Sequence, residues 1–127
     1  MRLLLDTHSF IWWLTRPSEL TPKTDRAIRD PDHEVFVSAV TTWEISIKSA
    51  LGKLPRVPMD QLEKQIVLSK FTPLPVQIAH TLAVHKLPPI HKDPFDRLLV
   101  AQAKLENLTL VTRDLRLKEY GLPVLET

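Results

Sequence analysis

The sequence of 127 residues contains no cysteine, only two glycines and no long hydrophobic run. Without cysteine, disulfides, thiolate zinc sites and cysteine nucleophiles are excluded, and any metal must bind to oxygen or imidazole ligands. No apolar stretch approaches the roughly 20 residues of a membrane-spanning helix. Asp6 and His8 interrupt the apolar N-terminus, which therefore lacks the unbroken core of a secretory signal. We expect a cytoplasmic protein that does not enter a membrane.

An excess of one charge is also nearly absent, since 17 basic and 15 acidic residues leave a formal net charge of +2. This excess is too small to identify a nucleic-acid-binding protein by itself. A content of 43% hydrophobic and 25% charged residues fits a folded chain that buries a real core. The sequence has no internal repeat, low-complexity tract or linker. We therefore expect one domain over residues 1–127.

Short apolar runs alternate with helical patterns along the chain. Strands are predicted at residues 2–5, 34–37, 74–76, 109–112 and 123–125, and Pro73 and Pro75 weaken the third of them. Helices are predicted at residues 7–14, 22–29, 40–51, 60–70, 78–85, 94–106 and 113–120. This alternation is typical of a three-layer α/β domain, with a mostly parallel central sheet and helices on both faces.

Two acidic residues stand at predicted strand ends. Asp6 follows the apolar run 3–5, and Asp114 comes just after the run 110–112. In parallel sheets, ligands gather at the carboxyl ends of the strands, near the point where the strand order reverses. Both carboxylates are therefore candidates for chemistry.

Two further acids lie on apolar helix faces. Val40, Trp43 and Ile47 form a helical stripe that includes Glu44. We therefore expect Trp43 in the core and the Glu44 carboxylate pointing inward. Asp96 repeats the pattern, because its neighbours at i+3, i+4 and i+7 are Leu99, Val100 and Ala103.

Inward-pointing acids need a compensating charge. Burying an unpaired carboxylate costs several kcal/mol, and two carboxylates about 4 Å apart repel by roughly 4 kcal/mol at an effective dielectric near 20. Salt bridges are the ordinary solution, but the inner stripes carry no basic residue, and Lys48 at i+4 from Glu44 predicts only a surface-type pair. A divalent cation fits better, and ligation by oxygen favours Mg²⁺ or Mn²⁺. Such a site suits phosphodiester hydrolysis.

Four blocks of the sequence resemble PIN-domain ribonucleases and, more narrowly, VapC-type toxins of bacterial toxin-antitoxin pairs. The blocks are Leu3-Leu4-Leu5-Asp6-Thr7-His8, Ser38-Ala39 with Trp43-Glu44-Ile45, Asp93-Pro94-Phe95-Asp96-Arg97-Leu98-Leu99-Val100-Ala101-Gln102-Ala103 and Leu110-Val111-Thr112-Arg113-Asp114. The resemblance implies a PIN fold and an Mg²⁺- or Mn²⁺-dependent endoribonuclease that prefers single-stranded RNA. It also implies a cognate antitoxin that blocks the active site.

The resemblance assigns the catalytic and metal-binding quartet to Asp6, Glu44, Asp96 and Asp114. The third acid of the family directly precedes a Leu-Leu-Val-Ala-type helix, which favours Asp96, while Asp93 is explained as a helix cap and an assisting role for it stays open. We expect Asp6 and Asp96 to bind one or two ions directly, and Glu44 and Asp114 to hold waters. Attack by water then leaves a 5′-phosphate and a 3′-hydroxyl.

Basic and aromatic residues near the acids suggest contacts with partners. Lys92, Arg97 and Arg113 flank the acids in sequence and are candidates for binding RNA phosphates. The adjacent Trp12 and Trp13 point to different faces, so we expect one of them at the surface. An exposed tryptophan often marks an interface, here that of a homodimer or of the antitoxin.

Three hydroxyl residues are candidates for orienting the carboxylates or their waters. Thr7 and Thr112 adjoin the acids at the strand ends, and Ser38 precedes the helix that carries Glu44. Helix capping is the alternative for each. We expect His8 to be exposed or structural and assign it no role.

Other functions remain as alternatives. A phosphotransferase with Asp6 as nucleophile is disfavoured, because a second aspartate two positions later is missing. An RNA-processing PIN nuclease without an antitoxin, and a non-catalytic RNA- or protein-binding module of the same fold, both remain open.

Overall fold

The computed structural model describes residues 1–127 and contains one sheet of five parallel strands in the order β3-β2-β1-β4-β5. The strands are β1 (Arg2–Leu5), β2 (Glu34–Ser38), β3 (Thr72–Leu74), β4 (Thr109–Thr112) and β5 (Val124–Glu126). β1 lies at the centre, where Leu4 pairs with Phe36 of β2 and with Leu110 of β4. The chain builds outward from β1 to β3 on one side and then returns to its other side, so the strand order reverses between β1 and β4.

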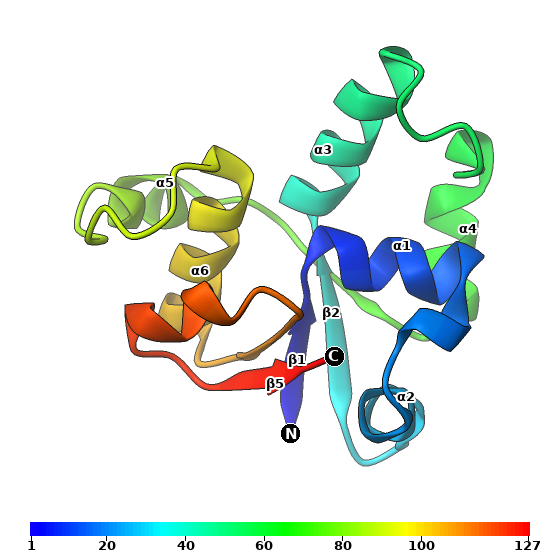
Figure 1. Cartoon of the computed structure of the whole chain (residues 1–127), viewed down its shortest axis with the longest axis horizontal. Helices are drawn as coiled ribbons and strands as arrows, with labels where there is room; N and C mark the ends of the chain where they lie inside the picture. Colours follow the sequence, from blue (N-terminus) through cyan, green and yellow to red (C-terminus); the bar gives the residue numbers. More distant parts are fainter.

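Helices cover both faces of this sheet. The α-helices are α1 (Thr7–Thr15), α2 (Pro22–Arg29), α3 (Ala39–Ala50), α4 (Leu62–Leu68), α5 (Ile78–Val84) and α6 (Pro94–Glu106). The 3-10 helices are η1 (Pro17–Glu19), η2 (Met59–Gln61) and η3 (Leu115–Tyr120). Figure 1 shows α5 and α6 on one side of the strands, α1, α2 and α4 on the other, and α3 beyond the strand ends. None of the helices combines the length and apolar character needed to cross a bilayer.

The core is divided into two apolar layers by β1. Leu3 and Leu5 pack with Phe10 of α1 on one face, and Leu4 packs with Leu99 of α6 on the other. Successive side chains of a strand point to opposite faces, so the unbroken apolar run of β1 supplies both layers. The predicted three-layer α/β architecture is confirmed.

Three element boundaries differ from those predicted. β3 comes two residues earlier than expected and includes Pro73, which an edge strand tolerates because its missing N–H faces away from the neighbouring strand. The predicted helix 60–70 is split into η2 and α4. The predicted helix 113–120 is the 3-10 helix η3, which begins only after Asp114 caps it.

The prediction that Trp43 packs in the core is wrong. Trp43 is 57% exposed, and the buried side of α3 is formed by Val40, Thr41, Glu44 and Ile45. Residues at i, i+1, i+4 and i+5 share one helix face, and Trp43 lies outside that set. Glu44 therefore points inward as predicted, although Trp43 and Ile47 of the stripe used to predict it are exposed and only Val40 is buried.

The prediction that Trp12 or Trp13 is the exposed tryptophan is also wrong. Both are half-buried against the core layer beneath α1. The indole N–H of Trp13 donates to Ser69 at 3.0 Å, and the Arg113 guanidinium lies over the Trp12 ring at 4.2 Å. The exposed indole is that of Trp43, which meets the Phe95 ring edge-on at 5.2 Å.

Candidate metal centre

Asp6 and Asp114 meet because their strands are neighbours. Asp6 follows β1, Asp114 follows β4, and the backbone N–H of Asp6 donates to Val111 O at 3.0 Å. Each carboxylate also caps the next helix, since Asp6 Oδ1 accepts from Ser9 N at 2.9 Å and Asp114 Oδ1 accepts from Arg116 N at 3.1 Å. Both therefore lie at the carboxyl edge of the sheet, where the strand order reverses.

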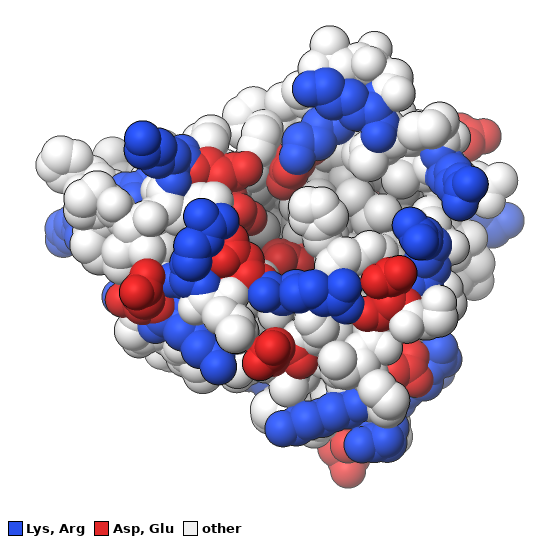
Figure 2. All heavy atoms as spheres, viewed as in Figure 1, with Lys and Arg blue, Asp and Glu red and all other residues white.

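The N-terminus of α6 adds two acids to the same cleft. Asp93 is the helix cap, because its Oδ1 accepts from Phe95 N at 2.8 Å and from Asp96 N at 3.1 Å. Asp96, in the first turn, lines the cleft together with Asp6, Asp93 and Asp114. Figure 2 shows acidic side chains gathered in a hollow near the centre of this face, with basic side chains around it.

Asp6 and Asp96 lack a lysine or arginine partner. Asp6 is 7% exposed, and burial raises the pKa of its carboxyl group although hydrogen bonds from Ser9 and Thr112 oppose the shift. Burial, followed by the charges of Asp93 and Asp6, raises the pKa of Asp96 to about 7. Asp96 forms an ion pair only with His91, at 3.5 Å, and Asp6 forms none. Both carboxylates are held where their negative charge is poorly compensated.

Glu44 comes from α3 and is not among the residues that line this cleft. It is 3% exposed, its Oε1 accepts from the Thr7 hydroxyl at 2.7 Å, and its Oε2 is paired with Lys48. Its charge contributes to raising the pKa of Asp96, so the two carboxylates interact. This hydrogen bond gives Thr7 the position of a residue that orients the Glu44 carboxylate, as predicted for it from the sequence. Because the Glu44 carboxylate is buried, its pair with Lys48 differs from the predicted surface-type contact.

Asp114 is paired with Arg116 through two hydrogen bonds. Nε donates to Oδ1 at 3.0 Å and Nη2 donates to Oδ2 at 2.7 Å. These bonds lower the pKa of Asp114 to about 2. The quartet predicted from the sequence thus contains two acids with a lysine or arginine partner, Glu44 and Asp114, and two without one, Asp6 and Asp96.

His91 belongs to this site and was missed in the sequence. Its Nε2 lies 3.0 Å from Asp114 Oδ2 and 3.5 Å from Asp96 Oδ2, and the Asp93 N–H donates to its Nδ1 at 3.0 Å. Nε2 also lies 3.0 Å from Arg116 Nη2, so His91 contacts two acids and one arginine of the site. His91, Asp96 and Asp114 each offer one ligand atom within 4.8 Å of the others. The sequence signal that could have identified His91 is its position two residues before Asp93, the residue that caps α6.

Two of the three hydroxyl residues lie near the carboxylates. The Thr7 hydroxyl donates to Glu44, and the Thr112 hydroxyl both bonds to Asp6 and accepts from Asp114 N at 3.0 Å. The Ser38 hydroxyl instead accepts from Val40 N at 3.0 Å and donates to Gln102 Oε1 at 2.5 Å. Ser38 is therefore a helix cap with no contact to the acids.

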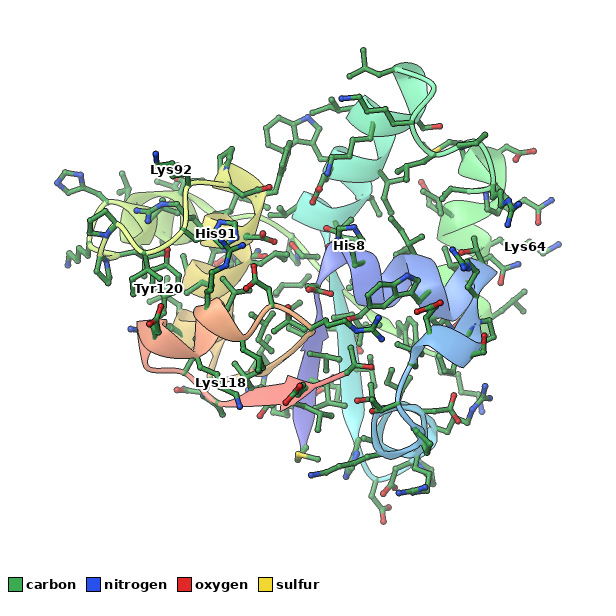
Figure 3. The ribbon with its side chains drawn as sticks, viewed as in Figure 1. His8, Lys64, His91, Lys92, Lys118 and Tyr120 are labelled. Carbon is green, nitrogen blue, oxygen red and sulfur yellow. The ribbon has the colours of Figure 1, made fainter.

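The three predicted RNA-binding cations differ in their surroundings. Arg97 donates to the carbonyls of Pro88 at 3.0 Å and Val84 at 3.2 Å, and so holds the loop before α6. Arg113 donates to Thr127 O at 2.7 Å. Lys92 is exposed on the loop that carries His91 (Figure 3). The placement of Arg97 gives it a structural role and does not support the predicted contact with RNA.

The chemistry of the donors fits a hard divalent ion. Asp6 and Asp96 offer carboxylate oxygens in a cleft of about 480 Å³, and neither is neutralised by a lysine or arginine. Mg²⁺ and Mn²⁺ take a few carboxylates and retain waters, and a bound ion compensates the charges that raise these pKa values.

Comparison with known proteins places this architecture in a family. A model of the PIN domain matches residues 3–122. Ribonuclease VapC22 of Mycobacterium tuberculosis is 30% identical over 126 residues, which cover 95% of this chain and 93% of that protein. The chain therefore belongs to the PIN-domain family, and its resemblance to VapC-type proteins is confirmed.

Solved structures show the same fold at lower sequence identity. VapBC2 from Rickettsia felis, bound to a DNA fragment from its promoter, matches with a TM-score of 0.76 and 17% identity over 99% of this chain and 98% of that chain. FitAcB from Neisseria gonorrhoeae matches with a TM-score of 0.68 and 22% identity over 98% of this chain and 96% of that chain.

Proposed function

We propose that the protein is a divalent-metal-dependent endoribonuclease that prefers single-stranded RNA and acts as the toxin of a toxin-antitoxin pair. The observation that carries the proposal is the pair Asp6 and Asp96, two carboxylates in one cleft without a lysine or arginine partner. The relationship to ribonuclease VapC22 supports RNA as the substrate.

The acidic residues of the site have different proposed roles. Asp6 and Asp96 would hold Mg²⁺ or Mn²⁺, which when bound lowers the pKa of a water and stabilises charge on the phosphate. Glu44, oriented by Thr7, and Asp114 would hold waters at the edge of the site. Since water and not the ribose 2′-hydroxyl attacks, the products carry a 5′-phosphate and a 3′-hydroxyl.

Two protein partners complete the proposal. The structural relatives include complexes of VapB with VapC, which supports a cognate antitoxin that covers the cleft. We also propose a homodimer, supported by large exposed apolar side chains such as Trp43, Ile78 and Leu82. The mass of the isolated protein in solution tests the dimer, and a monomer alone would contradict it.

Induced expression in bacteria tests the function most directly. The wild type is expected to arrest growth, and Asp6→Ala is expected to abolish the arrest. Arrest by both forms would contradict a catalytic origin. A purified protein that binds Mn²⁺ but never cleaves RNA would favour the binding module, and the lack of a small neighbouring antitoxin gene would favour an RNA-processing enzyme.

A further inference from the structure

Arg116 differs from the other cations at the cleft in having donors available to a ligand. Its side chain is 66% exposed. Nε and Nη2 bond to Asp114, Nη2 also lies 3.0 Å from His91 Nε2, and Nη1 has no hydrogen-bond partner. Arg113, the other basic residue that lines the cleft, donates to Thr127 and Glu19 and lies over Trp12. Arg116 is therefore the guanidinium that can turn to a ligand in the cleft.

A nuclease with this cleft needs such a cation. Asp6, Asp93, Asp96 and Asp114 line the cleft and repel an RNA phosphate. One ion held by Asp6 and Asp96 compensates only part of this charge. A guanidinium binds phosphate and carboxylate with the same planar, two-pronged geometry, so Arg116 can exchange one for the other without losing hydrogen bonds.

We propose that Arg116 is a phosphate-binding residue of this nuclease. When the metal site engages Asp114, the Arg116 guanidinium releases the Asp114 carboxylate and binds a non-bridging oxygen of the RNA. The inference rests on the proposed ribonuclease function. Before substrate arrives, Arg116 acts as a stand-in cation for one carboxylate of the site. Arg116 and the ion therefore compete for the Asp114 carboxylate. Once RNA is bound, both cations compensate the charge of its phosphate.

This exchange predicts opposite changes in two affinities. Without Arg116, Asp114 has no competing cation, so Mn²⁺ binds more tightly in the absence of RNA. Without Arg116, the RNA loses one phosphate contact and binds more weakly. If Arg116 merely held Asp114 in place, its removal would weaken Mn²⁺ binding and leave the salt dependence of RNA binding unchanged.

The experiment compares Arg116→Gln and Arg116→Lys with Lys64→Gln. Lys64 is an exposed residue of α4, far from His91 in Figure 3, and its replacement controls for the loss of one positive charge. Electron paramagnetic resonance measures free Mn²⁺ in a titration without RNA. Fluorescence anisotropy measures binding of a labelled single-stranded RNA at several salt concentrations, in an Asp6→Asn background that prevents cleavage.

For Arg116→Gln we expect Mn²⁺ affinity to rise about 2- to 5-fold, the value of an exposed ion pair. We expect RNA affinity to fall about 10-fold, with a salt slope smaller by about 0.7, as for one phosphate contact with a single strand. Arg116→Lys should recover part of the RNA affinity, and Lys64→Gln should change either affinity less than 2-fold.

Two outcomes overturn the inference. Weaker Mn²⁺ binding by Arg116→Gln means that Arg116 positions Asp114, and an unchanged salt slope means that Arg116 does not contact phosphate. Wild-type protein that neither binds Mn²⁺ nor cleaves RNA contradicts the proposed function instead. Thermal unfolding followed by circular dichroism shows whether the variants are folded. If Arg116→Gln is unfolded, the Mn²⁺ and RNA affinities of Arg116→Lys test the inference.

Discussion

The Thr7 hydroxyl donates to the buried carboxylate of Glu44 at 2.7 Å, although the two residues are 37 positions apart in sequence. Thr7 opens α1 and Glu44 lies in the middle of α3, so this bond joins the two helices. It also fixes which Glu44 oxygen is occupied, because Lys48 binds the other.

Replacing Thr7 with valine should destabilise the protein by about 1.5–3 kcal/mol. Valine keeps the shape but removes the hydrogen bond to a buried charged group, which is worth that much. Urea unfolding measures the change. Thr42→Val is the matched control on α3, since the exposed Thr42 hydroxyl bonds only to Ala39 O, and it should change stability by less than about 0.5 kcal/mol. Equal stability of Thr7→Val and wild type would contradict a role for Thr7 in holding Glu44.

The metal-free protein should lose stability as pH rises from about 4 to 7. Burial and neighbouring acids raise the pKa of Asp96 to about 7, so the folded state binds a proton that the unfolded state has released. Stability is therefore fully present below the unfolded pKa and is lost as pH rises, by up to about 1.4 kcal/mol per pH unit. The lowered pKa of Asp114 acts only at more acidic pH.

Urea unfolding with a chelator, from pH 4.5 to 8, measures this slope. Asp96→Asn should reduce this slope to the part that the raised pKa of Asp6 contributes, and should stabilise the metal-free protein at pH 8. Mn²⁺ should stabilise the wild type more at pH 8 than at pH 5, because a proton competes with the ion for the same carboxylate. A slope that survives unchanged in Asp96→Asn would assign it to other groups.

The sequence predicted the acids better than their surroundings. Asp6 and Asp114 could be placed because strand ends and parallel pairing determine their position with little dependence on side-chain packing. Glu44 was placed inward, but Trp43 was misplaced, because composition does not distinguish an apolar stripe at the surface from one in the core.

His91 and Arg116 escaped prediction for a different reason. His91 lies in the loop before α6 and Arg116 in the short 3-10 helix η3, and neither segment has a long periodic pattern that relates a residue to a face of the fold. Their contacts with Asp114 depend on how the loop before α6 approaches the end of β4, which is a tertiary relationship. Arg97 shows the converse, since a cation beside an acid in sequence can be directed to backbone carbonyls.

Arg97→Gln should reduce stability without the loss of a phosphate contact. Its guanidinium donates to Pro88 O, Val84 O and the Tyr120 hydroxyl, so the loop before α6 loses several charge-assisted hydrogen bonds. We expect a loss of about 2–3 kcal/mol by urea unfolding. Arg26→Gln, at an exposed position of α2, controls for charge and should change stability by less than about 0.5 kcal/mol. A smaller salt slope for RNA binding by Arg97→Gln would instead support the RNA-phosphate contact that the sequence predicts for Arg97.

Asp6→Asn and Asp114→Asn should reduce RNA cleavage unequally. Asp6 is buried, lacks a basic partner and would hold the ion directly, whereas Asp114 is paired with Arg116 and would act through water. We expect a loss of at least about 100-fold for Asp6→Asn and about 10-fold for Asp114→Asn, the range spanned by ligands and by groups that support them. Initial rates on a labelled single-stranded RNA with saturating Mn²⁺ measure both. The same digests report the chemistry, because water attack leaves 5′-phosphates, whereas 2′,3′-cyclic phosphates as the main product would mean that the ribose hydroxyl attacks and that the acids do not activate water.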